Sequence, residues 1–338
     1  MNKGSNISEH GFKLCYNKHD EESVIFILMN ERFNVVKVLD WLKSGDSSIK
    51  RLTEVYLQNH QVPYVSSGWI KQYIDLFDLK TNMWGGGIYG PKWISTFYTL
   101  KDLKSLEIDP KDPIYQKGLD TLVYHMWNHK MWKEDDVCVV GMMVSMLAYG
   151  RYDHKIIDEM ILYLFKHYQT DGGWNCQDHR SEKSSVHTTL SVLEALSDYK
   201  RYGYQTYSHE IKTYQQSGEA FLLKKHLYLS ETTHEPMFPR ITDFHFPTRW
   251  FYDVLKALEY FQSVSHPYHP HMKEALDLLK SKFERGYLTK GTTHSGRLHF
   301  KLEDTYAGRM NTLRGLKVIQ FYDPALYEKL ISTEINPK

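Results

Sequence analysis

The sequence predicts an all-α protein of one domain, in which five or six helical hairpins close into a ring, an α/α toroid. Three observations lead to this prediction. Apolar residues recur with helical spacing from about residue 46 onward, no strand-like alternation follows residue 45, and the predicted helices group into pairs that repeat along the chain. A chain of 338 residues would ordinarily divide into two domains. In a repeat architecture, however, each unit adds its own layer to one continuous core.

Residues 1–45 give a weak pattern, and residues 46–338 are predicted to form the toroid. The stretch 23–30 fits either a strand or a short buried helix, and we expect the whole of 1–45 to be an N-terminal extension packed on the ring. Apolar stripes with helical spacing then predict eleven helices. They cover 48–58, 68–79, 91–106, 112–127, 135–150, 154–169, 184–202, 208–227, 246–264, 269–284 and 309–322.

The first helices of successive pairs begin near residues 91, 135, 184, 246 and 309, and each opens with polar side chains. The second helices carry Lys and Glu on one face, as helices exposed to water do. If the first helices form an inner ring, their N-terminal ends converge on one mouth of a cavity and favour an anionic group there. Helix capping by residues such as Asp135 and Thr248 is the alternative explanation of the polar starts.

Composition favours some functions and argues against others. Aromatic residues make up 14% of the chain, which suits an aromatic-lined cavity or, equally, aromatic packing between helices. A net charge of +1 argues against nucleic acid as a partner. The three cysteines do not suggest a disulfide framework, and an odd number suits a reducing compartment. With no apolar run of signal-peptide or membrane-spanning length, we expect a cytoplasmic protein without a transmembrane segment.

One motif carries a family resemblance. Residues 164–174 read LFKHYQTDGGW, with Gln169, Gly172 and Trp174 in a Q-x-x-G-x-W arrangement, and Trp84 begins a degenerate copy. Over residues 84–325 the chain resembles the prenyltransferase and squalene-oxidase repeat superfamily. This superfamily includes squalene–hopene cyclases, class II terpene cyclases and the β-subunits of protein prenyltransferases, all α/α toroids. The resemblance implies that Gln and Gly shape the connection between helices while Trp packs on the next hairpin.

The resemblance also implies a zinc site. Prenyltransferase β-subunits hold Zn²⁺ with an Asp-x-Cys pair and a His at the next inner helix, which corresponds here to Asp136, Cys138 and His187. Cys176 could replace Asp136 as a ligand. Three protein ligands leave one position open for catalysis, where zinc would hold Cys138 or an incoming thiol as a thiolate nucleophile. The alternative is that Cys138 packs in a helix core as a small apolar residue.

Several basic residues are candidates for binding an anionic head group such as a diphosphate or carboxylate. Lys130 and Lys133 stand where the prenyltransferases place basic residues for the substrate diphosphate, although Val139 replaces their Tyr. These enzymes also need a separate α-subunit, and this sequence says nothing about a partner subunit. Arginine can grip phosphate or carboxylate with two hydrogen bonds, or it can bond loop carbonyls. The candidates at inner helix starts are Arg249 with its neighbour Trp250, and Arg309.

A second chemistry uses a carboxylic acid. Class II terpene cyclases protonate an alkene or epoxide with a D-x-D-D motif, of which this chain matches the last two positions, Asp135 and Asp136, with Lys133 at the first. An adjacent Lys favours the charged form of a carboxyl and so opposes this role. Three hypotheses follow. The protein is a zinc-dependent enzyme acting on an apolar, isoprenoid-type substrate, a metal-free cyclase or isomerase, or a non-enzymatic toroid that binds a lipid or peptide.

Overall fold

A computed structural model of the protein describes residues 35–129, 136–176 and 181–337. Within these ranges it contains thirteen α-helices, two short helical turns of other types and two strands of two residues each, so the prediction of an all-α protein is confirmed. The stretch 23–30 lies outside the described residues. None of the described helices combines the length and the apolar character needed to cross a bilayer.

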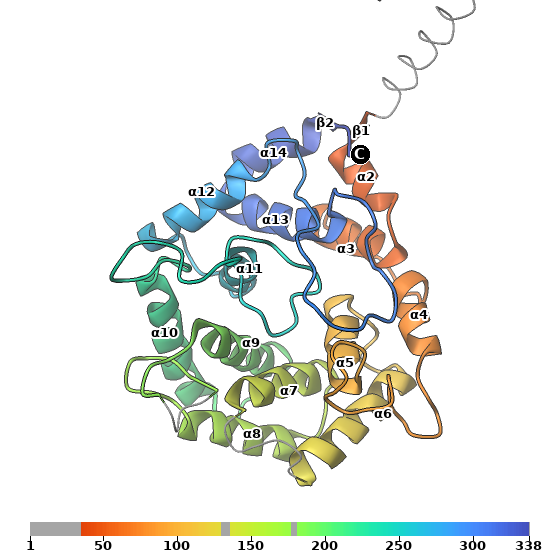
Figure 1. Ribbon diagram of the computed structural model, residues 1–338, viewed down its shortest axis with the longest axis vertical. Helices are drawn as coiled ribbons and strands as arrows, with labels where there is room; N and C mark the ends of the chain where they lie inside the picture. Colours follow the sequence, from red (N-terminus) through yellow and green to blue (C-terminus); the bar gives the residue numbers. More distant parts are fainter. Residues whose placement is uncertain (1–34, 130–135, 177–180, 338) are drawn as a thin grey trace, which may run out of the picture.

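The helices form two layers, which Figure 1 shows along the short axis of the molecule. The inner helices are α3 (Ser47–Leu57), α5 (Thr96–Ser105), α7 (Val137–Tyr149), α9 (Val186–Arg201), α11 (Val254–Ser263) and α13 (Arg309–Tyr322). The outer helices are α2 (Val38–Lys43), α4 (Gly68–Asp75), α6 (Pro113–Leu122), α8 (His154–Lys166), α10 (Ser208–Lys224), α12 (Lys273–Ser281) and α14 (Pro324–Ser332). The turn η1 (Val123–Asn128) extends α6, and η3 (Pro270–Met272) precedes α12.

Burial distinguishes the two layers. In the inner helix α7, twelve of thirteen residues are buried, because neighbouring helices enclose it on all sides. In the outer helix α8 only Ile157, Met160, Ile161 and Leu164 are buried, which is the single apolar stripe of an amphipathic helix. Each fully buried apolar side chain of this size stabilises the fold by about 1.5–3 kcal/mol.

The contacts between helices agree with this division into inner and outer helices. Each inner helix contacts the outer helix that follows it in the chain, and the inner helices contact one another in the series α3, α13, α11, α9, α7, α5. Helix α4 contacts both α3 and α5 and so joins the two ends of this series. The ends of the described chain also meet, because β1 (Val36–Lys37) pairs antiparallel with β2 (Glu334–Ile335). The loops before α11 and α13 lie over the centre in Figure 1.

The connection that carries the Q-x-x-G-x-W motif is held by a buried tryptophan. The Trp174 indole N–H donates to the carbonyl of Leu164 (2.7 Å), and the Trp174 backbone N–H donates to Oγ1 of Thr189 (3.0 Å). The Trp174 ring lies against Gly218 of α10, where an added Cβ would come within 3.1 Å of it. The tryptophan therefore packs on the outer helix of the next hairpin.

The same connection occurs elsewhere in the chain, which supports the hairpin repeat. The Trp84 backbone N–H donates to Oγ1 of Thr96 (3.1 Å), and the Trp84 ring lies against Gly118 of the next outer helix. The Leu288 backbone N–H donates to Oγ1 of Thr312 (2.9 Å) in the connection before α13. In each case a threonine in the first turn of an inner helix fixes the loop in front of it.

Two inner helices begin later than predicted. The helices predicted over 91–106 and 246–264 start at Thr96 and Val254. Arg249 has a φ of 53°, a left-handed conformation that interrupts a right-handed helix. The Asp253 side chain then caps α11 by accepting the N–H of Lys256 (2.8 Å). Arg249 and Trp250, predicted to lie in a first helical turn, therefore lie in the loop before α11.

Candidate functional site

A pocket of about 480 Å³ lies where the loops before α11 and α13 meet the start of α5. Arg249 lines it and is buried. The Arg249 guanidinium lies over the Trp93 ring, 4.7 Å from its centroid, and its Nη2 lies 3.4 Å from Oδ2 of Asp102. The other terminal nitrogen, Nη1, is buried and has no hydrogen-bond partner in the described part of the chain. This pocket therefore contains a cationic donor whose bonding capacity is not fully used.

Asp102 is the buried acid of this pocket. Its Oδ2 accepts a hydrogen bond from the Tyr73 hydroxyl (3.2 Å), while Oδ1 is buried without a partner among the described residues. Burial raises the pKa of the Asp102 carboxyl even though Arg249 and Tyr73 act in the opposite direction. The carboxyl thus retains more of its protonated form than an exposed aspartate does.

Histidines and aromatic rings form the rest of the wall. The His294 ring stacks on Phe251 with a centroid distance of 3.3 Å, and His299 Nε2 lies 3.0 Å from Oγ1 of Thr99. Burial, followed by the charges of neighbouring groups, lowers the pKa of His294 to about 3. Burial likewise lowers the pKa of His299 to about 4. Both imidazoles are therefore neutral at neutral pH, and the positive charge at this pocket comes from Arg249, Lys290 and Lys301.

The other two candidates at inner helix starts, Trp250 and Arg309, do not line this pocket. Trp250 stacks on Phe251 at a centroid distance of 3.8 Å, next to the Arg249 pocket. Arg309 is not among the residues that line the pocket. Its Nε donates to the carbonyl of Trp41 (3.2 Å) and its guanidinium covers the Trp41 ring at 4.9 Å. Arg309 therefore connects α13 to α2 by bonding a carbonyl in the last turn of α2.

Two of the predicted metal ligands, Cys138 and Cys176, lie side by side. Cys138, in the first turn of α7, forms a disulfide with Cys176, which follows Trp174, and their Cα atoms are 5.7 Å apart. The pairing arises because the loop after Trp174 returns to the N-terminal end of α7. The sequence analysis did not anticipate this pairing, and the reducing compartment stays a prediction. Cys15 lies outside the described residues.

The remaining predicted metal ligands do not gather around these sulfurs. His187 accepts the Tyr252 backbone N–H at Nδ1 (3.0 Å) and stacks on Phe238. Burial, followed by the charge of Lys256, lowers the pKa of His187 to about 4. Asp136 is partly buried directly before α7. Over the ranges that the structure describes, no three His, Cys, Asp or Glu side chains are placed to hold a metal ion.

Three candidate residues lie outside the described part of the chain: Lys130 and Lys133, proposed for a diphosphate, and Asp135, proposed as an acid. The structure nevertheless brings Arg249, Trp250 and His187 to the same end of the inner helices. Trp250 and His187 contact each other, with ring centroids 5.5 Å apart.

A second cavity, of about 240 Å³, lies between the six inner helices and was missed by the sequence analysis. Its lining is mainly ionic, with Tyr56, Phe246 and Tyr260 as its aromatic residues. Charges three or four residues apart within buried helices, such as Lys101 and Lys104 or Glu194 and Asp198, were the pattern that could have revealed it. Six basic and four acidic residues face it: Lys101, Lys104, Arg201, Lys256, Arg314 and Lys317, with Glu107, Glu194, Asp198 and Glu259.

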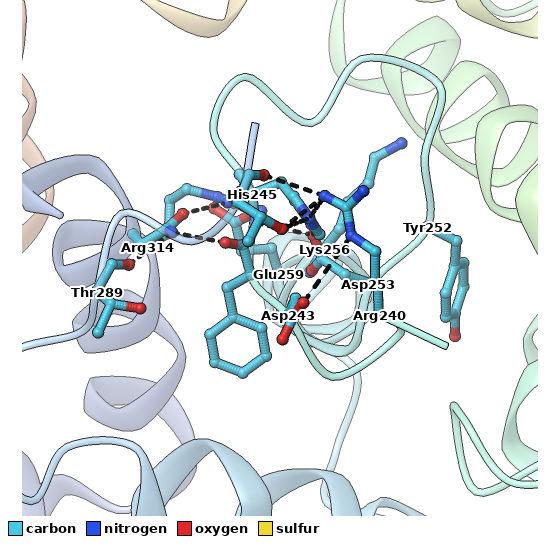
Figure 2. Close-up of polar contacts among 12 residues, drawn as sticks. Arg240, Asp243, His245, Tyr252, Asp253, Lys256, Glu259, Thr289 and Arg314 are labelled. Atoms are coloured by element: carbon cyan, nitrogen blue, oxygen red, sulfur yellow. Dashed lines mark hydrogen bonds and ion pairs between the residues drawn. The ribbon is translucent and has the colours of Figure 1, made fainter. Parts of the chain in front are cut away.

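Most of these charges are paired. Lys256 lies 3.2 Å from Glu194, Lys104 lies 2.8 Å from Asp198, and Arg314 lies 2.7 Å from Glu259. Figure 2 shows Arg314 between Glu259 and the loop that carries His245. Nη1 of Arg314 donates to the His245 carbonyl (2.9 Å), so this ion pair also fixes a loop that lines the Arg249 pocket.

No family model, curated protein or solved structure matches this chain. The resemblance to the prenyltransferase and squalene-oxidase repeat superfamily therefore rests on the motifs in the sequence and stays a prediction. The geometry itself describes an all-α protein with several pockets, of which one lies at an end of the inner helices and one between them.

Proposed function

We propose that the protein is an α/α toroid that binds an amphipathic, isoprenoid-type molecule at the Arg249 pocket, with the anionic head on Arg249. Two helical layers, a series of inner-helix contacts whose two ends are joined through α4, and repeated tryptophan connections support the toroid. A pocket of about 480 Å³ is within the usual size range for small-molecule sites.

The observation that carries this proposal is the unpartnered Nη1 of Arg249. Buried polar groups almost always have a hydrogen-bond partner, and a charged donor without one is costly. A phosphate or carboxylate oxygen would supply the missing acceptor with a strong, charge-assisted bond. The rings of Trp93 and Phe300 line the same pocket and would contact an apolar chain.

Replacing Arg249 by methionine is expected to weaken binding of geranyl diphosphate by roughly 10- to 100-fold. A hydrogen bond to a charged group contributes about 1.5–3 kcal/mol, which corresponds to this range of dissociation constants. Isothermal titration calorimetry measures the effect, and geraniol, which lacks the head group, should bind both proteins equally. Arg309→Met is the matched control, since Arg309 also covers a tryptophan ring at an inner helix start. Equal affinity of wild type and Arg249→Met for the diphosphate would contradict the proposal.

We propose further that the bound molecule is converted, as in a prenyltransferase or cyclase. Asp102 supports a proton-initiated reaction, because it lines the aromatic pocket and burial raises the pKa of its carboxyl. In the sequence analysis, the role of the acid that protonates the substrate was suggested for Asp135 or Asp136.

Asp102→Asn is expected to lower turnover of a polyprenyl substrate at least 100-fold, because the amide cannot act as the acid. Product formation is followed by gas chromatography, and the affinity for geranyl diphosphate should change less than threefold. If wild type binds the ligand but converts none of the polyprenyl substrates offered, the non-enzymatic binding protein is the better description. Wild-type turnover in Asp102→Asn would exclude this acid.

We propose zinc binding only for the protein in which the disulfide between Cys138 and Cys176 has been reduced. With Cys138 and Cys176 joined to each other and His187 accepting the Tyr252 N–H, the predicted ligands do not fit zinc as they are placed. After reduction and removal of metals, we expect the protein to bind about one equivalent of zinc, measured by mass spectrometry under native conditions. Cys138→Ser should lose this binding. Reduced wild type that takes up no zinc would end the zinc hypothesis without affecting the Arg249 pocket.

A further inference from the structure

The ionic cavity between the inner helices contains a lysine that the proposed function does not use. Lys101 lies on α5, lines this cavity and is partly accessible to solvent. The Arg249 pocket does not include Lys101, although the Lys101 charge acts on Asp102 of that pocket, so a test of Lys101 must keep its charge.

Lys101 differs from the other cations of the cavity in its contacts. The acids that face the cavity pair with other residues: Glu194 with Lys256, Asp198 with Lys104, Glu259 with Arg314, and Glu107 with Arg51. Lys317 lies 4.1 Å over the Tyr56 ring. In the ranges covered by the structure, the Lys101 ammonium forms no hydrogen bond or ion pair. Among the described residues, Lys101 is therefore a cation of this cavity whose ammonium has no partner, while Arg314, although paired with Glu259, also keeps one nitrogen, Nη2, without a hydrogen bond.

The surroundings of Lys101 increase the share of its neutral form. Burial, followed by the positive charge of Lys256, lowers the pKa of the Lys101 ammonium to about 8. About a tenth of the amine is then neutral at pH 7, whereas an ordinary lysine has less than roughly a thousandth. A neutral amine is nucleophilic, and a desolvated lysine next to another cation is a recognised way to activate it.

We propose that Lys101 is a reactive amine that forms an imine with a small carbonyl compound bearing a carboxylate. In this step the Lys101 nitrogen bonds to the carbonyl carbon, and the carbonyl oxygen leaves as water with two protons. The imine nitrogen then takes a proton from the solvent, and no oxidant or reductant is needed. The excess of basic over acidic residues in the cavity favours the carboxylate, and a volume of about 240 Å³ suits a molecule of a few carbon atoms.

Trapping with glyoxylate tests this proposal. The full-length protein is treated with glyoxylate and cyanoborohydride, which fixes an imine as a stable carboxymethyl amine, and modified lysines are mapped by mass spectrometry. Lys101 is expected to react at least ten times faster than the exposed Lys155, with a rate that rises with pH to a midpoint near 8.

Lys101→Arg keeps the positive charge but cannot form the imine, so it should remove the fast reaction and leave the Lys155 rate and the melting temperature unchanged. Folding of this variant is checked by circular dichroism, and its affinity for geranyl diphosphate should equal that of wild type. Modification of Lys101 no faster than that of Lys155, or an unchanged fast reaction in Lys101→Arg, would overturn the proposal.

Discussion

Replacing Trp174 by alanine is expected to lower the free energy of unfolding by about 4 kcal/mol, because removal of a buried tryptophan costs about 3–5 kcal/mol. The ring is fully buried, and its loss leaves a cavity next to Gly218 and an unpaired carbonyl at Leu164. Urea denaturation followed by circular dichroism measures the change. Trp84→Ala should have a similar effect, since Trp84 makes the same connection two repeats earlier.

The conservative variant Trp174→Phe separates packing from hydrogen bonding. It retains a ring against Gly218 but lacks the indole N–H, so it should lose about 1 kcal/mol for the hydrogen bond plus a smaller cavity term. A loss of less than 1 kcal/mol in Trp174→Ala would show that this connection does not hold successive hairpins together.

Replacing Arg314 by methionine is expected to lower the free energy of unfolding by about 3 kcal/mol. Removal of one partner of a buried ion pair costs about 3–5 kcal/mol because the other charge remains unpaired. Arg314 is buried, and its loss removes donors from Glu259 and from the His245 carbonyl. Glu259 is partly exposed, which places the effect at the lower end of this range.

The double variant Arg314→Met with Glu259→Gln tests the cause of this loss. If the unpaired carboxylate is responsible, the second substitution should restore at least 1 kcal/mol of the free energy of unfolding, measured by urea denaturation at pH 7. Arg285→Met, at an exposed position, is the control and should change the stability by less than 0.5 kcal/mol. No recovery in the double variant would show that Arg314 acts through the His245 loop alone.

Helical periodicity in the sequence predicted most of the fold. The helix expected over 309–322 has those bounds, and the one expected over 48–58 covers Ser47–Leu57. These helices have regular apolar stripes and clear ends. Helices α2 and α14 were missed; α2 has only six residues and lies within 1–45, where the pattern is weak. The starts of α5 and α11 were misplaced because apolar and aromatic loop residues continue the helical pattern, although the backbone at Arg249 is left-handed.

The site was predicted only in part. Arg249 was found because a cation at an inner helix start is visible in the sequence, but its partner Asp102 comes from α5, 147 positions earlier in the chain. The disulfide was missed because nothing local indicates that the loop after Trp174 returns to α7. The ionic cavity was missed because its charges come from helices far apart in sequence, and ion pairs of this kind form only when those helices pack together.

The most direct test of the account is a crystal structure of the protein with a non-hydrolysable thio analogue of geranyl diphosphate. The account predicts that the diphosphate lies within hydrogen-bond distance of Nη1 of Arg249, with the hydrocarbon chain against Trp93 and Phe300. Ligand density elsewhere, with Nη1 of Arg249 bonded to ordered water in an otherwise empty pocket, would contradict it.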